Sequence, residues 1–368
     1  MAKNNNLHTA KTTKNDEFYT MLTDIEKEMR YYKDFFKGKV VYCNCDDARE
    51  SNFFKYFSLN FEFLGLKKLI STGYKADGKG VVLVYEGDKN GNRRVDNEEI
   101  IVNELNGDGD FRSEECIEYL KECDVVVTNP PFSLFRQYVK QLMDYGKKFI
   151  VMANNNAITY KEFFPYIKNG KVWLGRTLFT GKMPYFKVSD SYNLTNDRFE
   201  KREDGLYKQV NGICWFTNVP NDNNRQVLDL YKRYSFEDYP KYDNYDAIEC
   251  GRMENLPCDY NGVIGIPITG LKYLWSDGTI HTEYNGTTTQ FEIIALGNSR
   301  ENFTPNKDYI KPIKVLKDGK KVNGNAINCV LAIESKTKPI NMIYYTSENV
   351  PYLIAPYARI LIKKIQQG

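Results

Sequence analysis

The segment DVVVTNPPF, residues 124–132, constrains the fold of this 368-residue chain more than any other stretch. Its run of β-branched residues has no polar alternation, which is typical of a strand buried on both faces of a parallel sheet. Pro130 and Pro131 then end the strand, because proline fixes φ and offers no backbone N–H. We therefore expect a central strand that leads, at its carboxyl end, into a stiff loop of Asn129, the two prolines and Phe132.

Strand-like and helix-like segments alternate on both sides of this strand. Short apolar runs predict strands at 39–43, 67–74 and 148–153, and a further strand, at the edge of the sheet, at 213–217. Apolar residues at three- and four-residue spacing predict helices at 21–36, 51–57, 113–122 and 134–145. Residues 81–85 and 99–105 flank a turn and predict a hairpin, and Thr23 with Glu26 is typical of a capping box. The pattern indicates an α/β fold, with a parallel sheet covered by helices on both faces.

The character of the sequence changes after Pro220. Turn-forming pairs such as Asp277-Gly278 separate short apolar runs, and helical patterns become scarce. The length of the chain suits one large domain with an appended lobe. We expect a flexible basic arm at 1–14, an α/β domain at 15–220, and a smaller irregular β-rich lobe at 221–368.

The net charge of the chain is only +3, so no global basic field marks it as a nucleic-acid binder. Two stretches are locally basic: 161–187 has six basic residues against one acidic residue, and 300–321 has seven against three. Such stretches are usually solvated faces, but they also suit contacts with a phosphate backbone. The candidates for such contacts are Arg176, Lys182, Lys311 and Lys314.

Cysteine and histidine usage argues against a metal site. The chain has eight cysteines and two histidines, and none of the spacings of zinc sites occurs. The polar N-terminus does not resemble a signal peptide, and no run of 18 apolar residues could cross a membrane. We expect a cytoplasmic, nucleoid-associated protein with reduced thiols, no bound metal and no contact with membranes.

The Asn-Pro-Pro-Phe loop has the chemistry to hold a flat ring that carries an amino group. The Asn129 side-chain oxygen and a neighbouring proline carbonyl form two acceptors for the two amino hydrogens. Phe132 supplies an apolar face on which the ring can stack. Held in this way, the nitrogen lone pair is less delocalised into the ring and can attack an electrophilic methyl group without a strong base. The alternative is a plain strand-ending turn, since Asn-Pro commonly starts turns.

Five stretches together resemble a known family. They are NDEFYT (15–20), VVYCNCDDARESNFFKYF (40–57), LGLKKLI (64–70), GDGDFRS (107–113) and NPPF (129–132). The last resembles the [DNS]PP[FYW] signature of amino-methyltransferases that use S-adenosylmethionine. The whole set is similar to the EcoRI-type adenine-N6 DNA methyltransferases. The resemblance implies a Rossmann-like methyltransferase sheet with helices on both faces, a catalytic domain at 15–220, and a target-recognition lobe at 221–368.

The resemblance also assigns roles to individual residues. The NDEFYT segment would close over the methionine end of the cofactor, Asn44 to Asp47 would face its amino-acid group, and Asp110-Phe111, with Asp108 as a rival, would hold its adenine. The residues implied for S-adenosylmethionine are Phe18, Tyr19, Thr20, Asn44, Asp46, Asp47, Asp108, Asp110, Phe111 and Asn129. The catalytic residues are Asn129, Pro130, Pro131 and Phe132.

The stretch after the first strand departs from the usual methyltransferase pattern. CNCDDARE contains no glycine, whereas many methyltransferases have a glycine-rich turn there. The EcoRI-type pattern shares this feature, so the site is not excluded. The choice between Asp46 and Asp47 as partner of the cofactor ammonium stays open. Only the displaced Asp77 follows the second strand, so no ribose ligand is named.

The implied substrate is double-stranded DNA. An adenine inside a duplex cannot reach Asn129, so the base must be flipped out of the helix. The resemblance implies a short palindromic site with an AATT core such as GAATTC, and a protein that works as a monomer. It is also compatible with a cognate restriction endonuclease that acts on the same site without direct contact.

Three other functions compete with this interpretation. Pro257-Cys258 is the nucleophile pattern of carbon-5 cytosine methyltransferases, but it lies far from the predicted strand that would have to carry it. RNA and protein-amide methyltransferases also use Asn-Pro-Pro-aromatic loops, although the other four stretches point elsewhere. A catalytically silent DNA-binding protein on the same scaffold is the remaining alternative, against which the intact Asn129 argues.

Overall fold

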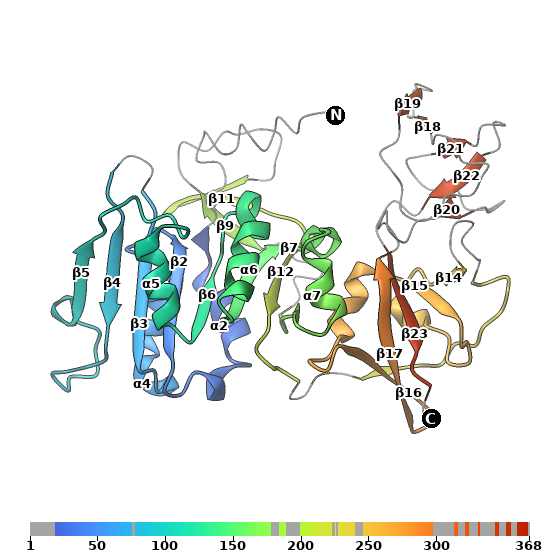
Figure 1. Ribbon diagram of the computed structural model, residues 1–368, viewed down its shortest axis with the longest axis horizontal. Coiled ribbons are helices and arrows are strands. Elements are labelled where there is room, and N and C mark those ends of the chain that lie inside the picture. The colour runs from blue at the N-terminus through green and yellow to red at the C-terminus, as the bar shows by residue number, and fades with distance from the viewer. Residues whose placement is uncertain are drawn as a thin grey trace. The chain divides into compact units, whose positions relative to one another are not determined.

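The computed structural model (Figure 1) divides the chain into two compact units. The first contains Met1–Ala157 and Leu174–Asn223, and the second contains Ile158–Trp173 and Asn224–Gly368. Residues 158–173 thus group with the second unit, whereas the sequence predicts a single domain at 15–220. The structure describes residues 19–75, 78–177, 184–188, 199–222, 225, 227–239, 246–296 and 359–366, and the course of the strands at 313–315, 321–323, 330–331, 343–345 and 351–354.

The first unit is built on a sheet with the strand order β5-β4-β3-β2-β6-β7-β12-β8. β3, β2, β6 and β7 run parallel, whereas β4, β5 and β12 pair antiparallel with their neighbours. The strand bounds are β2 Val40–Asp46, β3 Lys68–Gly73, β4 Val81–Tyr85, β5 Ile100–Glu104, β6 Val125–Thr128, β7 Lys148–Asn154, β8 Trp173–Leu174 and β12 Ile213–Thr217. The predicted parallel sheet is therefore limited to the centre of a mixed sheet, and β12 is not its edge strand.

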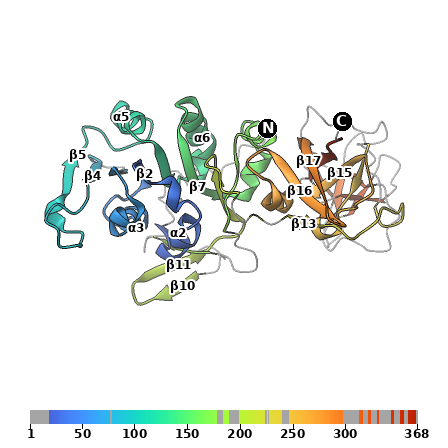
Figure 2. The same cartoon turned by 90° about the horizontal axis from the view of Figure 1, so that it is seen from below.

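Helices cover both faces of this sheet. Figure 2 shows α2 and α3 on one face, and α5 and α6 on the other. Their bounds are α2 Leu22–Met29, α3 Asn52–Leu59, α4 Phe61–Leu64, α5 Glu114–Glu122 and α6 Phe135–Asp144. Short 3-10 helices lie at η1 Lys33–Phe35, η2 Asn97–Glu99, η3 Phe132–Leu134 and η4 Asn155–Thr159. None of the helices among the described residues is long and apolar enough to cross a membrane.

The single helix predicted at 21–36 is wrong in two respects. α2 ends at Met29, and the chain continues through tighter turns into η1. Met21 occupies the N-cap without a side-chain hydrogen bond, so the predicted Thr23–Glu26 capping box does not form. Phe36 is nevertheless fully buried. The apolar spacing that continues to Phe36 therefore indicates core positions, not one continuous helix.

The core of the first unit is rich in aromatic rings. Phe53 of α3 meets Trp215 of β12 edge-on, with ring centroids 6.2 Å apart. Phe57 meets Phe36 in the same manner at 5.1 Å. Such edge-to-face pairs contribute about 0.5–1.5 kcal/mol beyond the burial of their area. They fix α3, whose N-terminus faces the carboxyl end of β2, against the sheet.

The loop that joins β4 to β5 is held by its own side chains. Asp88 accepts hydrogen bonds from the N–H groups of Gly91 and Arg93, at 2.7 and 2.6 Å. Oxygen-bearing side chains recur at the first, third, fifth, ninth and twelfth positions of 88–99, the spacing of EF-hand loops, although Arg93 stands where those loops need glycine. They are Asp88, Asn90, Asn92, Asp96 and Glu99. Their hydrogen bonds to donors of the loop fix the course of the hairpin.

A smaller sheet in the first unit has the strand order β1-β9-β11-β10. Its strands are β1 Tyr19–Thr20, β9 Tyr185–Val188, β10 Phe199–Arg202 and β11 Gly205–Gln209. Tyr19 pairs with Lys187 and Thr20 with Phe186. The end of the NDEFYT motif is thus a strand of this sheet.

The second unit is mainly β in its described residues. Its larger sheet has the order β13-β16-β17-β23-β15-β14, and a five-stranded sheet has the order β19-β18-β21-β22-β20. The larger sheet contains β13 Leu228–Asp229, β14 Ala247–Glu249, β15 Val263–Pro267, β16 Thr279–Tyr284, β17 Thr287–Leu296 and β23 Arg359–Lys364. The smaller contains β18 Ile313–Val315, β19 Lys321–Asn323, β20 Val330–Leu331, β21 Ile343–Tyr345 and β22 Pro351–Ile354. The unit also has the helix α7 Phe164–Lys168 and the 3-10 helices η5 Met253–Asn255 and η6 Ile268–Tyr273.

A buried ion pair crosses the larger sheet of the second unit. Arg359 of β23 donates to both carboxylate oxygens of Glu249 of β14, at 2.7–2.9 Å. Both side chains are about nine-tenths buried, with exposed fractions of 10% and 11%. Removing either partner would leave the other charge buried, which typically costs about 3–5 kcal/mol.

Candidate active site

The Asn-Pro-Pro-Phe loop follows the carboxyl end of β6 directly. β6 ends at Thr128, η3 begins at Phe132, and α6 begins at Phe135. Asn129 is 6% exposed and its side-chain oxygen is buried, whereas Phe132 is half-buried and packs partly against the core. The Pro131 carbonyl accepts a hydrogen bond from the Leu134 N–H at 2.9 Å. The loop therefore stands at the end of a central parallel strand, where ligands bind in open α/β sheets.

Asn44 ties this loop to the strand next to it. The Asn44 backbone carbonyl accepts a hydrogen bond from the Thr128 hydroxyl, and its side-chain oxygen accepts one from the Tyr138 hydroxyl. The residues come from β2, β6 and α6, and all three are buried. Asn44 thereby fixes the two sequence motifs on β2 and β6 relative to each other.

The end of the NDEFYT motif lies beside the same strand ends. The Asn52 side chain, at the start of α3, donates to the Thr20 carbonyl at 2.8 Å. The Thr20 hydroxyl, which is buried, contacts the sulfur of Met152 in β7 at 3.4 Å. Tyr19 is half-buried, and Phe18 lies outside the described residues. Thr20 is therefore brought together with β7 and the N-terminus of α3.

The two candidate aspartates after β2 differ in their surroundings. Asp46 is half-buried and accepts a hydrogen bond from the Ser51 hydroxyl at 3.1 Å, and Ser51 in turn caps α3 by accepting the Phe53 N–H at 3.2 Å. Asp47 is exposed, and its side chain accepts the Arg49 N–H at 2.9 Å, within its own turn. Asp46 is thus the carboxylate held at the N-terminus of α3.

Cys45 adopts the backbone conformation that glycine usually supplies. Its φ is +71°, and the pairing of β2 with β3 shifts register between Cys43 and Asp46. Non-glycine residues rarely take a positive φ, at a cost of about 1–3 kcal/mol. The glycine-free stretch CNCDDARE therefore still makes the sharp bend at the strand end, through Cys45.

The loop of Asp108 to Phe111 packs against the end of β3 through glycines. A Cβ added to Gly109, whose φ is +83°, would lie 2.3 Å from the Gly73 carbonyl oxygen. The Lys75 N–H also donates to the Asp108 carbonyl at 2.8 Å. Because no side chain fits between the two segments, the Asp108–Phe111 loop is set close to the carboxyl end of β3.

The side chains of this loop already have partners within the chain. The Arg112 guanidinium donates two hydrogen bonds to the Asp110 carboxylate, at 2.8 and 2.5 Å. The Asp108 side chain accepts a hydrogen bond from the Asp110 N–H at 3.0 Å. The buried Phe111 ring meets Tyr138 edge-on, with centroids 5.0 Å apart. Contact of either Asp108 or Asp110 with the adenine of the cofactor therefore stays a prediction.

Tyr138 and Cys45, beside the strand ends, are kept in their neutral forms. Burial, with the nearby Cys45 thiol as a further cause, raises the pKa of the Tyr138 hydroxyl well above its ordinary value. Burial and the Asp46 charge raise the pKa of the Cys45 thiol in the same direction. Tyr138 thus keeps the proton that it donates to Asn44 at neutral pH.

Of the four candidate phosphate contacts, the structure describes the side chain of Arg176 alone. Its guanidinium donates to the Asn221 carbonyl at 3.2 Å and lies over the Tyr31 ring, 5.3 Å from the centroid. The buried Glu28 carboxylate accepts its backbone N–H at 2.9 Å. Lys182 and Lys311 lie outside the described residues, and only the backbone course of Lys314, in β18, is described. Contact of these residues with DNA stays a prediction.

Three features of the site were not foreseen from the sequence. Tyr138 sits on the apolar face of α6, so its spacing looked like that of an ordinary core residue. Thr128 looked like the last residue of a strand, and Gly73 like the end of another. The glycines of the GDGD stretch are typical of a close approach between two backbone segments, but nothing in the sequence identifies Gly73 as the partner of Gly109. Among the described residues, no group of three His, Cys, Asp or Glu side chains could hold a metal ion.

The fold and site define the class of protein. A mixed α/β sheet carries an Asn-Pro-Pro-Phe loop at the end of the central strand β6, with Asp46 at the end of the neighbouring β2 and the Asp108–Phe111 loop at the end of β3. This is the position in which the sequence predicts the reacting loop of an amino-group methyltransferase. The model of the family described as adenine-specific methyltransferase EcoRI matches residues 6–365. The chain belongs to that family, and it is an adenine-specific DNA methyltransferase.

Known relatives are similar over most of the chain. Type II methyltransferase M.EcoRI from Escherichia coli is 47% identical over 282 residues, which cover 73% of this chain and 86% of that protein. M.MpnI from Mycoplasma pneumoniae is 39% identical, and M.MgeORF184P from Mycoplasma genitalium 37% identical, each over 267 residues. Both of these matches cover 71% of this chain and 80% of the relative. A methyl donor and DNA as substrate follow from this family.

Proposed function

We propose that this chain transfers a methyl group from S-adenosylmethionine to the N6 amino group of a flipped-out adenine at a specific site in double-stranded DNA. The observation that carries the proposal is the Asn-Pro-Pro-Phe loop at the carboxyl end of β6, with Asn129 buried and Phe132 half-buried. Asn44 links that loop to β2 and α6, so the loop is held by strands and a helix rather than by flexible segments. The three Type II methyltransferase relatives support the same activity.

The loop acts by accepting the hydrogens of the amino group. The Asn129 side-chain oxygen takes one of them, and the Pro130 carbonyl takes the other, because the Pro131 carbonyl already accepts the Leu134 N–H. Phe132 stacks on the adenine ring. With both N–H bonds directed at these acceptors, the N6 lone pair is less delocalised and can attack a methyl carbon. After the transfer, the nitrogen sheds one proton through the acceptor oxygens to water.

The residues around the strand ends fit both ends of S-adenosylmethionine. Asp46, with Asp47 as the alternative, suits the cofactor ammonium, and the capped N-terminus of α3 suits its carboxylate. The Asp108–Phe111 loop, set against the end of β3, has a carboxylate for an amine and a ring for a heterocycle. When bound there, the cofactor would supply an electrophilic methyl group on a sulfonium sulfur. Tyr19 and Thr20, with Phe18, would line its methionine end.

The two parts of the chain would divide the work. We regard the eight-stranded sheet as a Rossmann-like methyltransferase sheet, and residues 15–220 as the catalytic domain. The β-rich lobe at 221–368 would recognise the DNA target. The locally basic stretches would contact phosphates, through Arg176, Lys182, Lys311 and Lys314 among others. Flipping the adenine costs about a few kcal/mol, which these contacts would offset.

The proposed setting is a bacterial modification system. The relatives are named Type II methyltransferases, and all three come from bacteria. We propose a cytoplasmic, nucleoid-associated monomer that methylates a short palindrome with an AATT core, such as GAATTC. A restriction endonuclease for the same site would act independently and without direct contact.

Asn129→Ala tests the mechanism. We expect methyl transfer to fall by at least about a hundredfold, because one preorganised acceptor is lost, while binding to DNA is retained. The measurement is single-turnover transfer of labelled methyl to duplex DNA, alongside equilibrium binding. Asn60→Ala, at the opposite end of α3 from its N-terminus, removes an asparagine of the same size and is the matched control. Methylation by Asn129→Ala at the wild-type rate would contradict the mechanism.

Sequencing of genomic DNA from cells that express the protein tests the activity itself. We expect methylated adenines at one short palindromic motif. Methylation found only in RNA or in protein amides would favour the alternative methyltransferases. Specific binding of DNA without any methylation would favour the silent DNA-binding protein.

A further inference from the structure

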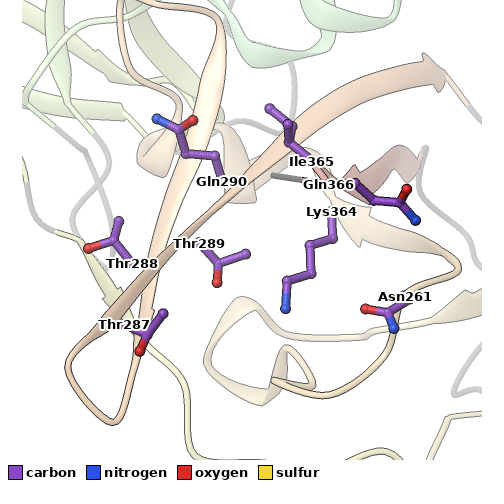
Figure 3. A pocket seen from close by; sticks show the side chains of 8 residues that line it. All are labelled: Asn261, Thr287, Thr288, Thr289, Gln290, Lys364, Ile365 and Gln366. Atoms are coloured by element: carbon purple, nitrogen blue, oxygen red, sulfur yellow. The ribbon is translucent and has the colours of Figure 1, made fainter. Parts of the chain in front are cut away.

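The second unit contains a polar hollow that the proposed catalytic site does not use. Its volume is about 390 Å³. It is lined by the start of β17, by the end of β23 and by the loop before β15 (Figure 3). The lining residues are Thr287, Thr288, Thr289, Gln290, Asn261, Lys364, Ile365 and Gln366.

The hollow exists because two neighbouring strands end at different heights. The hairpin of β16 and β17 turns at Asn285 and Gly286, both at positive φ, and pairs along its whole length. β23 pairs with β17 only from Phe291 onward, and the Ile365 N–H makes a last hydrogen bond to the Gln290 carbonyl at 2.9 Å. The segment 287–289 therefore extends past the end of β23, and the hollow lies along it.

The chemistry of the lining narrows the choice of ligand. Three hydroxyls and three carboxamides offer donors and acceptors, Lys364 adds a positive charge, and the lining contains no carboxylate. A metal ion would need carboxylates, and a typical small-molecule site would need mostly apolar walls. Ammonium, hydroxyl and carboxamide groups together suit the phosphates and base edges of a nucleic acid.

Lys364 extends into the hollow (Figure 3), and the Gln290 carboxamide is held by a neighbouring side chain. Figure 3 shows the Lys364 side chain extending between the hairpin and Asn261. Gln290 contacts a ring nitrogen of His281 at 3.0 Å, and the same nitrogen lies 2.8 Å from the Asp277 carboxylate. The His281 ring is stacked on Trp275, with centroids 4.3 Å apart and planes 9° from parallel. A carboxamide supported in this way is preorganised, which favours specific contacts.

We propose that this hollow binds the target DNA, with Lys364, on one face of the paired strands β17 and β23, against a phosphate, and with the Gln290 carboxamide and Thr288 hydroxyl, on the other face, against base edges. The inference rests on the proposed function, because it names where the second unit meets the substrate. A carboxamide pairs its donor and acceptor with the edge of adenine, and a threonine methyl group suits that of thymine. The hollow therefore favours A·T pairs in the recognised site.

The phosphate contact is tested by the salt dependence of DNA binding. Full-length Lys364→Gln is compared with Lys363→Gln, a neighbour on β23 that is exposed and does not line the hollow. Binding to sheared genomic duplex DNA is measured over a series of salt concentrations. We expect Lys364→Gln to bind more weakly and to lower the slope of log affinity against log salt by about 1, and Lys363→Gln to match the wild type. An unchanged slope for Lys364→Gln overturns the phosphate contact.

The base contacts are tested by the methylated motif in cells. We expect Gln290→Ala and Thr288→Val to raise methylation at sites that differ from the wild-type motif by one A·T pair, by about tenfold relative to the cognate site. Thr288→Val keeps the shape of an exposed side chain, so its result does not depend on the contact between Gln290 and His281. An unchanged motif in both variants overturns the base contacts.

The failure of the proposed function gives a different pattern. A wild-type chain that binds duplex DNA but methylates no adenine would contradict the proposed activity, and the Lys364→Gln comparison would still decide the hollow. A wild-type chain that methylates one motif, with all three variants identical to it in slope and motif, would overturn the hollow alone.

Discussion

At the scale of single residues, the sequence predicted the reacting loop better than its supports. Asn129 and the two prolines were identified from a strand followed by rigid residues, which is a local pattern. Tyr138 and Thr128 were not, because their roles depend on hydrogen bonds to Asn44, a residue that is 94 and 84 positions away in the sequence. Cys45 could not be recognised either, since its positive φ follows from the bulge in the pairing of β2 with β3.

The stability of the protein should depend on how well the residue at position 45 tolerates a positive φ. We expect Cys45→Val to be less stable than Cys45→Gly by about 1–3 kcal/mol, because a β-branched residue is strained at a φ of +71° and glycine is not. Urea denaturation of the two variants measures the difference. Cys43→Val, in the regular part of β2, is the control and should lose less stability than Cys45→Val. Equal midpoints for Cys45→Val and Cys45→Gly would contradict the assigned backbone strain.

Gly109→Ala should disturb the Asp108–Phe111 loop. Its new Cβ would lie 2.3 Å from the Gly73 carbonyl oxygen, so the loop has to move away from the end of β3. We expect a loss of stability of about 1–3 kcal/mol and at least tenfold weaker binding of S-adenosylmethionine by calorimetry. Gly107→Ala is the matched control, because a Cβ there meets nothing within 4 Å. Similar behaviour of the two variants would show that the close approach does not matter for the cofactor.

At the scale of secondary-structure elements, strands were predicted closely and pairing was not. Predicted strands such as 124–128 agree with the observed β6 to within a residue or so, because unbroken apolar runs mark buried strands. The hairpin predicted at 81–105 is observed as β4 and β5, and the strand predicted at 213–217 is observed as β12. Their antiparallel pairing with β3 and β7 was not predicted, since it depends on contacts between distant segments. The helix predicted at 21–36 failed at its second half, where apolar spacing persisted although the backbone left the α-helix.

The cap of α3 should affect both stability and the cofactor. Ser51→Ala removes an acceptor for the Phe53 N–H and a donor to Asp46, so we expect a loss of about 1 kcal/mol in the free energy of unfolding and weaker binding of S-adenosylmethionine. Ser51→Gly separates the two effects, because glycine costs only a few tenths of a kcal/mol at an N-cap but cannot donate to Asp46. Chemical denaturation and calorimetry measure the two quantities. Wild-type affinity in Ser51→Gly would rule out a role for the hydrogen bond to Asp46.

At the scale of the whole molecule, the two units differ in how far they could be foreseen. The first unit follows from a repeating strand–helix pattern that is visible in the sequence. The second is dominated by short strands, and its six-stranded sheet joins β13, near 228, to β23, near 360. Such long-range order leaves no periodic signal. Residues 158–173 group with the second unit, and no local sequence pattern indicates this grouping.

The whole protein should lose stability in alkali. Burial raises the pKa of Cys123 and Cys250 to about 12, and it raises the pKa values of Cys43, Cys45, Tyr42 and Tyr138 well above their ordinary values. These groups titrate near pH 9–10 once unfolded, so they stabilise the folded state fully below about pH 8.5. As the pH rises further, the unfolded chain releases their protons first, and stability falls.

The expected result is a melting temperature that is steady to about pH 8.5 and then declines toward pH 11. Circular dichroism at a series of pH values measures it. Cys123→Val, which removes one of the buried titrating thiols, should show a shallower decline. A melting temperature that is constant up to pH 10.5 would contradict the raised pKa values.

The discontinuity of the first unit has a consequence for how the protein is made. β7 ends at Asn154, but its partner β12 begins only at Ile213, after the chain has passed through the second unit. During synthesis on the ribosome, β7 is therefore left as an unpaired edge while about sixty more residues are translated. A nascent chain that is arrested between these two strands would expose the unpaired edge of β7. Translational pausing at this stage should therefore favour aggregation, and chaperones should bind the nascent chain mainly at the same stage.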